Sequence, residues 1–186
     1  MIIIGKIFHF SRCNHHTNKR LLSGLVAFIG IVFCCSFSTG LFAQQMPFPP
    51  PNQLQVYVVQ DLNFGSFTTG SGGSVIISPS GIRSATGNVF LMGSAAYQAI
   101  FNVRLIPGRL IHIQLGPPIQ LYRVGGGGQV TMEIGPTDKP NNQFVTTGGH
   151  PFINPVSVGG VLTVGDNTSN PAGAYQGNFS VTFIQE

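Results

Sequence analysis

The chain has 186 residues, of which only 8% are charged and 42% are hydrophobic, and its formal net charge is +4. Low charge combined with this apolar content excludes an intrinsically disordered protein, which pairs low hydrophobicity with high charge. All three cysteines, Cys13, Cys34 and Cys35, lie near the amino terminus, so the rest of the chain can form neither a disulfide nor a cysteine metal site.

The first 43 residues have the parts of a secretory signal peptide. Four basic residues and no acidic residue precede an uncharged apolar stretch, residues 21–37, and the small residue Ala43 is followed by polar Gln44. We therefore expect residues 1–43 to be cleaved between Ala43 and Gln44, and the protein to be exported. The alternative is an uncleaved anchor, although the apolar stretch is shorter than the ~20 residues of a spanning helix.

Cleavage would change the charge of the protein. Four of the nine basic residues lie in the leader, so residues 44–186 hold five basic and five acidic residues and have no net charge. A neutral chain lacks the basic surface that nucleic-acid binding requires. We expect no nucleic-acid partner and no membrane span after removal of the leader.

The remaining chain divides into a tether and one domain. Residues 44–53 contain four prolines, which cannot join a sheet interior because proline has no amide donor. This stretch is predicted to be an extended tether. Residues 54–186 have the length of a single domain with one core.

Apolar residues alternate with polar ones along most of residues 54–186, which predicts β-strands. In the middle of the chain the alternation predicts that Phe101, Val103, Ile111 and Ile113 lie in the core and that Arg104 and His112 face water. The strands at 97–105 and 110–115 are predicted to form a hairpin through Pro107-Gly108, and those at 161–164 and 174–184 a closing antiparallel pair. Gly70 to Gly73 is expected to be a flexible turn, and Gly125 to Gly128 a hairpin tip. Further strands are expected at 54–59, 74–78, 83–92, 119–124 and 130–134, and the strand that contains 161–164 is expected to begin at Val156.

No stretch in this region has the three- and four-residue spacing of a helix. We therefore expect an all-β fold, an immunoglobulin-like β-sandwich of about nine strands. A jelly roll is the alternative, because alternation does not determine topology.

The sequence contains few residues in patterns that indicate a catalytic, phosphate-binding or metal-binding site. His112 and His150 have no second ligand at metal-binding spacing, and the five carboxylates are scattered singly. Gly125 to Gly128 precedes a strand, whereas a phosphate-binding loop precedes a helix. We therefore nominate no catalytic, cofactor-binding or metal-binding residues and expect a protein that is not an enzyme.

Several short motifs, taken in order, resemble a family of secreted bacterial proteins classed as a domain of unknown function. They are Leu62 to Phe67, Val75 to Ser84, Phe101-Asn102-Val103, Gly160 to Gly165 and Pro171 to Phe179. That family is similar to pilin-like and spore-coat-U-like surface subunits. The resemblance implies an immunoglobulin-like sandwich without enzymatic activity.

Together these observations predict a structural or adhesin-like subunit, exposed on the cell surface or released, as in a fimbria-like assembly. Outer-membrane association or the periplasm are alternative locations after export. The expected partners are other protein subunits, including copies of the same chain, through edge pairing or donation of the strand Leu54 to Val59. Alternatively, this strand belongs to its own domain, or the protein is a binding module for a glycan or a small ligand.

Overall fold

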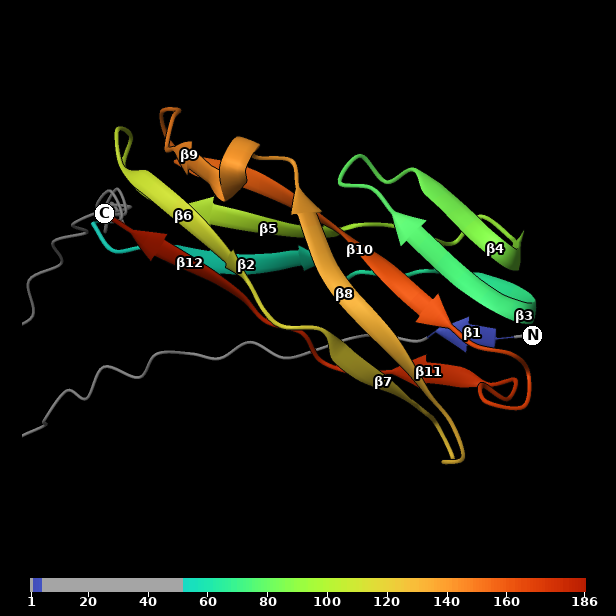
Figure 1. The fold of residues 1–186 in the computed structure, drawn as a ribbon. Helices are drawn as coiled ribbons and strands as arrows, with labels where there is room; N and C mark the ends of the chain where they lie inside the picture. The colour runs from blue at the N-terminus through green and yellow to red at the C-terminus, as the bar shows by residue number, and fades with distance from the viewer. Residues whose placement is uncertain (1, 5–51) are drawn as a thin grey trace, which may run out of the picture. The chain divides into compact units, whose positions relative to one another are not determined.

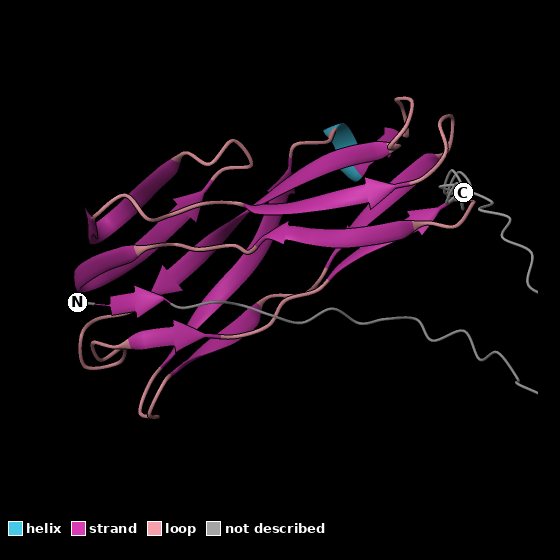
Figure 2. Ribbon diagram, turned by 180° about the vertical axis from the view of Figure 1, so that it is seen from behind, coloured by secondary structure: helices cyan, strands magenta, loops and turns pink. Residues whose placement is uncertain are grey.

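The computed structural model describes residues 2–4 and 52–186, which are almost entirely β-structure. Figure 2 shows strands throughout, with one short helical turn. The elements are β1 (Ile2–Ile4), β2 (Gln55–Gln60), β3 (Ser66–Ile77), β4 (Arg83–Met92), β5 (Ala99–Arg104), β6 (Leu110–Leu115), β7 (Ile119–Arg123), β8 (Gln129–Thr137), the 3-10 turn η1 (Pro140–Asn142), β9 (Gln143–Val145), β10 (Ile153–Val164), β11 (Ala174–Gln176) and β12 (Val181–Gln185).

The strands form two sheets, and the prediction of an all-β sandwich is confirmed. The larger sheet has the order β2-β5-β10-β8-β7-β11-β1-β3-β4, and the smaller one has the order β12-β6-β9 (Figure 1). Strands adjacent in a sheet are often distant in the sequence. Most of the pairing is therefore long-range.

Strand β10 changes partner along its length. Residues 153–158 pair with β5, whereas residues 160–164 pair with β3. The pairing with β8 also shifts register between Val158 and Gly160. A β-carbon at Gly159 would clash with the carbonyl oxygen of Ile77, so the close approach of β10 to β3 needs glycine there.

The larger sheet curls until its strands close a ring. Strand β10 pairs with both β8 and β3, and the series β8-β7-β11-β1-β3 returns to β10. Strand β1 completes this ring because it pairs parallel to β11 and antiparallel to β3.

One hydrophobic core joins the two sheets. Phe101 of β5 contacts Phe183 of β12, with ring centroids 5.7 Å apart. The predicted inward positions Phe101, Val103, Ile111 and Ile113 are all buried, and the predicted outward residue His112 is half-buried. The buried faces of these strands were predicted correctly, whereas Arg104 and His112, which were predicted to face water, are half-buried.

The predicted hairpin between residues 97–105 and 110–115 is wrong. Strand β5 pairs with β2 and β10, whereas β6 pairs with β12 and β9. The connection at Pro107-Gly108 therefore crosses from one sheet to the other. Buried Thr146 holds this crossing, because its hydroxyl donates to the Ile106 carbonyl at 2.7 Å and accepts from the Arg109 amide at 2.9 Å.

The predicted closing pair is also wrong. Strand β11 pairs with β7 and β1, and β12 pairs with β6 in the other sheet, so neither pairs with β10. The final stretch divides at Gly177, where a β-carbon would lie 2.7 Å from the Leu121 side chain. The closing strand lies at a sheet edge, because β12 is the first strand of the smaller sheet.

The prediction for one glycine-rich segment is confirmed, and the prediction for the other is wrong. Residues 125–128 form the tip of the β7–β8 hairpin, as predicted. Residues 70–73 are not a flexible turn, because they continue β3 through an irregularity where its register with β4 shifts. The Thr69 hydroxyl accepts from the Gly72 amide and donates to the Gly165 carbonyl, each at 3.2 Å, and thereby holds the bend.

The predicted first strand, Leu54 to Val59, belongs to its own domain. Residues 55–60 form β2, which pairs antiparallel with β5 of the same chain. The segment is therefore a strand of its own domain, and this alternative, rather than strand donation, agrees with the structure. Most of the expected tether, residues 44–51, lies outside the described residues.

Candidate functional site

His112 lies next to a carboxylate that the sequence did not nominate. Its Nε2 atom is 3.1 Å from Oε1 of Glu186, although the nitrogen has no hydrogen bond of good geometry. The two side chains are 37% and 62% exposed, so solvent screens any attraction between them. This arrangement is a surface ion pair when the imidazole is protonated.

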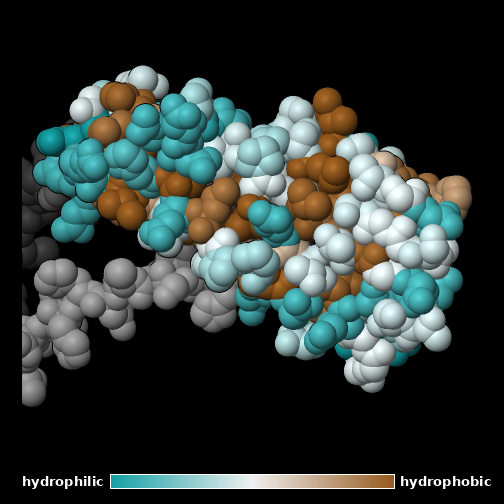
Figure 3. All heavy atoms as spheres, in the orientation of Figure 1, coloured by the Kyte–Doolittle hydropathy of each residue, from teal (hydrophilic) through white to brown (hydrophobic). Residues whose placement is uncertain are grey.

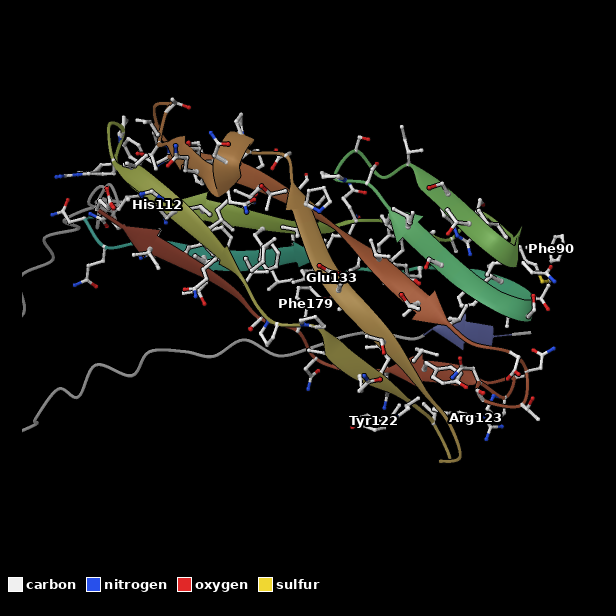
Figure 4. The ribbon with its side chains drawn as sticks, in the orientation of Figure 1. Phe90, His112, Tyr122, Arg123, Glu133 and Phe179 are labelled. Atoms are coloured by element: carbon white, nitrogen blue, oxygen red, sulfur yellow. The ribbon has the colours of Figure 1, made fainter. Side chains whose placement is uncertain are left out.

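Glu133 and Asp138, which could have acted with His112 as catalytic groups, do not lie beside it. Glu133 is exposed on β8, and Figure 4 shows it well separated from His112 on β6. Asp138 accepts from the Ser157 amide and from Lys139, at 2.8 Å and 2.9 Å. Asp138 therefore faces a backbone amide and a lysine rather than a histidine.

Asp166 anchors the loop before β11. Its carboxylate accepts from the Ser169 amide at 2.8 Å, and this bond holds the pKa of Asp166 below its ordinary value. Within the same loop, Asn170 is buried and its side chain bonds to the Gly165 amide and the Gln129 carbonyl. The hydrogen bonds of both residues are structural.

His150 is exposed in the loop before β10, where its ring packs edge-on against Phe152 at 5.9 Å. Across the part of the chain that the structure describes, no three His, Cys, Asp or Glu residues are grouped to hold a metal ion. The expected cleavage residues Ala43 and Gln44 lie outside the described residues, as does the leader except for Ile2–Ile4.

The clearest candidate surface is the outer edge of β4. Within the described strands, β4 pairs only with β3, so one side of its backbone has no sheet partner. Phe90, Leu91 and Met92 at its end are 62%, 38% and 41% exposed. Polar groups and apolar side chains are therefore both available to another chain.

The opposite edge of the larger sheet has a similar character. Strand β2 pairs only with β5 among the described strands, and Tyr57, Val58 and Val59 are 52%, 46% and 57% exposed. On the face seen in Figure 3, hydrophobic side chains are scattered among polar and neutral ones. Each of these two edges therefore carries three consecutive exposed apolar side chains.

Exposed aromatic residues lie on separate strands. Tyr57, Phe90 and Tyr122 belong to β2, β4 and β7, and Figure 4 shows Phe90 and Tyr122 well apart. The sequence identified the strand that carries Phe90 but contained no signal that this strand is an edge. Edge position depends on long-range pairing, which alternation does not determine.

These features define an all-β sandwich domain whose larger sheet has two exposed edges, β2 and β4. A family model described as domain of unknown function DUF4402 matches residues 54–184, and the chain belongs to that family. The search of curated proteins and the search of solved structures returned no match. Among the described residues, no helix has the length and apolar character needed to span a membrane.

Proposed function

We propose that the protein is a non-enzymatic structural or adhesin-like subunit that is exported to the cell surface or the extracellular space. It contacts other protein subunits, including copies of itself, through the edges of its larger sheet. The exposed apolar end of β4 is the observation that carries this proposal.

An unpaired strand edge can accept another strand through main-chain hydrogen bonds. Proteins that remain monomeric commonly protect such edges with charged residues or proline. The end of β4, Asn88 to Met92, itself contains neither, and the one charged group that reaches it among the described residues is Arg83, which donates to the Met92 carbonyl at 3.2 Å. Edge pairing is therefore favoured over donation of Leu54 to Val59, which is already paired as part of β2.

The resemblance to pilin-like and spore-coat-U-like subunits agrees with this role, since those proteins are structural β-sandwiches. A glycan-binding module would be favoured by exposed aromatic rings gathered on one face. Tyr57, Phe90 and Tyr122 are instead distributed over three strands. We therefore propose the structural role.

A pair of matched variants tests the role of the β4 edge. Phe90→Lys places a charge on the edge strand and should reduce self-association, with little change in thermal stability because Phe90 is 62% exposed. Tyr122→Lys changes an equally exposed aromatic, 59%, on β7, which has neighbours on both sides. It should leave association unchanged.

Sedimentation of both variants and the wild-type protein over a range of concentrations measures this difference. Equal association of the Phe90→Lys variant and the wild-type protein would contradict a role for the β4 edge. Equal loss in both variants would indicate a general charge effect rather than edge pairing.

A further inference from the structure

The position between β3 and β11 is filled by the amino terminus of the chain. Ile3 is paired with both Ser66 of β3 and Ala174 of β11. Ile2 is paired with Phe67, and Ile4 with Tyr175. Three residues at the start of the chain therefore join two strands that are more than a hundred positions apart in sequence.

Strands β3 and β11 are each paired with another strand on the side that faces away from β1. Ser66 and Phe67 pair with Met92 and Leu91 of β4, and Tyr175 pairs with Arg123 of β7. The Ala174 carbonyl accepts from the Val124 amide at 2.7 Å, on the β7 side. Because backbone groups alternate along a strand, those of Tyr175 point toward β1.

The strand β11 is held in place independently of β1. The Tyr175 hydroxyl donates to the Pro171 carbonyl at 2.7 Å, and Arg123 Nε donates to the Ala172 carbonyl at 2.9 Å. Phe67 and Tyr175, the residues paired with Ile2 and Ile4, are both completely buried. The gap between β3 and β11 thus offers main-chain groups of both strands, and the residues paired with its occupant include the buried aromatic residues Phe67 and Tyr175.

We infer that the gap between β3 and β11 is a strand-binding site for an extended, uncharged, apolar segment, and that Ile2–Ile4 of the same chain is its occupant. Isoleucine suits the site because β-branched side chains favour strands. Removal of residues 1–43, if it occurs as proposed, vacates the site and exposes two further strand edges. The suggestion that leader removal exposes edges for assembly rests on the proposed function, whereas the strand-binding site itself does not.

The substitution Ile3→Pro in the full-length chain tests the site directly. It removes the amide of the residue that is paired with both neighbours. Hydrogen exchange at Tyr175, whose backbone groups face β1, should become at least several-fold faster, with exchange in β5 unchanged. The control Ile7→Pro, outside β1, should leave all these rates at wild-type values.

A synthetic peptide of residues 1–8 provides a rescue of the Ile3→Pro chain. The wild-type peptide should restore slow exchange at Tyr175, and the same peptide carrying Ile3→Pro should not. Unchanged exchange in the Ile3→Pro chain, or no rescue by the wild-type peptide, would overturn the strand-binding site. Protection that depends on protein concentration would overturn the assignment to the same chain and identify a second copy as the donor.

Sedimentation separates this inference from the proposed function. If the peptide rescues exchange but the wild-type protein is monomeric at every concentration, the strand-binding site stands and the assembly role fails. If Ile3→Pro has no effect while the wild-type protein associates through β4, the site fails and the assembly role stands.

Discussion

Three arginine side chains in this protein donate to backbone carbonyls at a strand end and in loops. Arg83 donates to the Ser66 carbonyl at 2.6 Å, Arg104 to the Pro151 carbonyl at 3.1 Å, and Arg123 to the carbonyls of Ala172 and Gly126, both at 2.9 Å. Partial burial lowers the pKa of Arg83 from its ordinary value. These cations therefore satisfy carbonyl oxygens that the strands leave unpaired.

Two residues near β11 show how burial and hydrogen bonding act on titration. Burial raises the pKa of Tyr175, and the charge of Arg123 opposes this rise. The lowered pKa of Asp166 means that its contact with Ser169 is fully present above the ordinary carboxyl pKa. That contact is lost only as pH falls through the lower pKa of the folded state.

Phe101 and His112 should respond very differently to substitution. Phe101 is buried against Phe183, so Phe101→Ala should lower the free energy of unfolding by about 3 to 5 kcal/mol. His112→Ala removes a half-buried imidazole whose attraction to the exposed Glu186 is screened by solvent, and should be close to neutral. Urea denaturation of both variants measures the difference, and a larger loss for His112→Ala would contradict the packing of β5 and β6.

At the scale of the elements, strand faces were more predictable than strand partners. Alternation around Phe101 and Ile111 identified correctly which residues are buried, because side chains alternate between faces with a period of two. The same alternation carries no information on which strand lies alongside. Strands β5 and β6 are therefore consecutive in sequence but belong to different sheets.

The candidate edges were even less predictable. The sequence shows Phe90, Leu91 and Met92 as part of a strand, but their exposure follows from β4 being the last strand of its sheet. The pairing of Ile2–Ile4 with β3 and β11 has no local signal at all. These features arise from the ring that the larger sheet closes, which depends on contacts between distant segments.

The crossing of β10 and β3 gives a test at this scale. Gly159→Ala would place a β-carbon against the Ile77 carbonyl, so one strand must shift, and the free energy of unfolding should fall by about 1 to 3 kcal/mol. Gly149→Ala is the matched control, because a β-carbon at Gly149 would have no neighbouring atom within 4 Å and the residue is exposed. Equal thermal stability of the two variants would contradict the close approach.

At the scale of the whole molecule, export is the first proposal to test. The exported protein should begin at Gln44, because the uncharged apolar stretch ends shortly before Ala43. Amino-terminal sequencing of protein recovered outside the cytoplasm measures this directly. A chain that still holds residues 21–37 would instead be anchored by its leader.

The composition of the domain agrees with a structural role outside the cell. Residues 44–186 contain no cysteine and have no net charge, so the domain depends on strand pairing and one apolar core. The exposed ends of β4 and β2 are the surfaces through which such a domain can join others. Assembly through these edges is the central proposal.

The molar mass of the exported protein in solution, measured by light scattering across a range of concentrations, tests this proposal most directly. A single chain of the full sequence has a mass of 19.8 kDa, and the processed chain is smaller. Assembly through sheet edges predicts masses above that of one chain, rising with concentration. A mass equal to one processed chain at every concentration would contradict self-assembly.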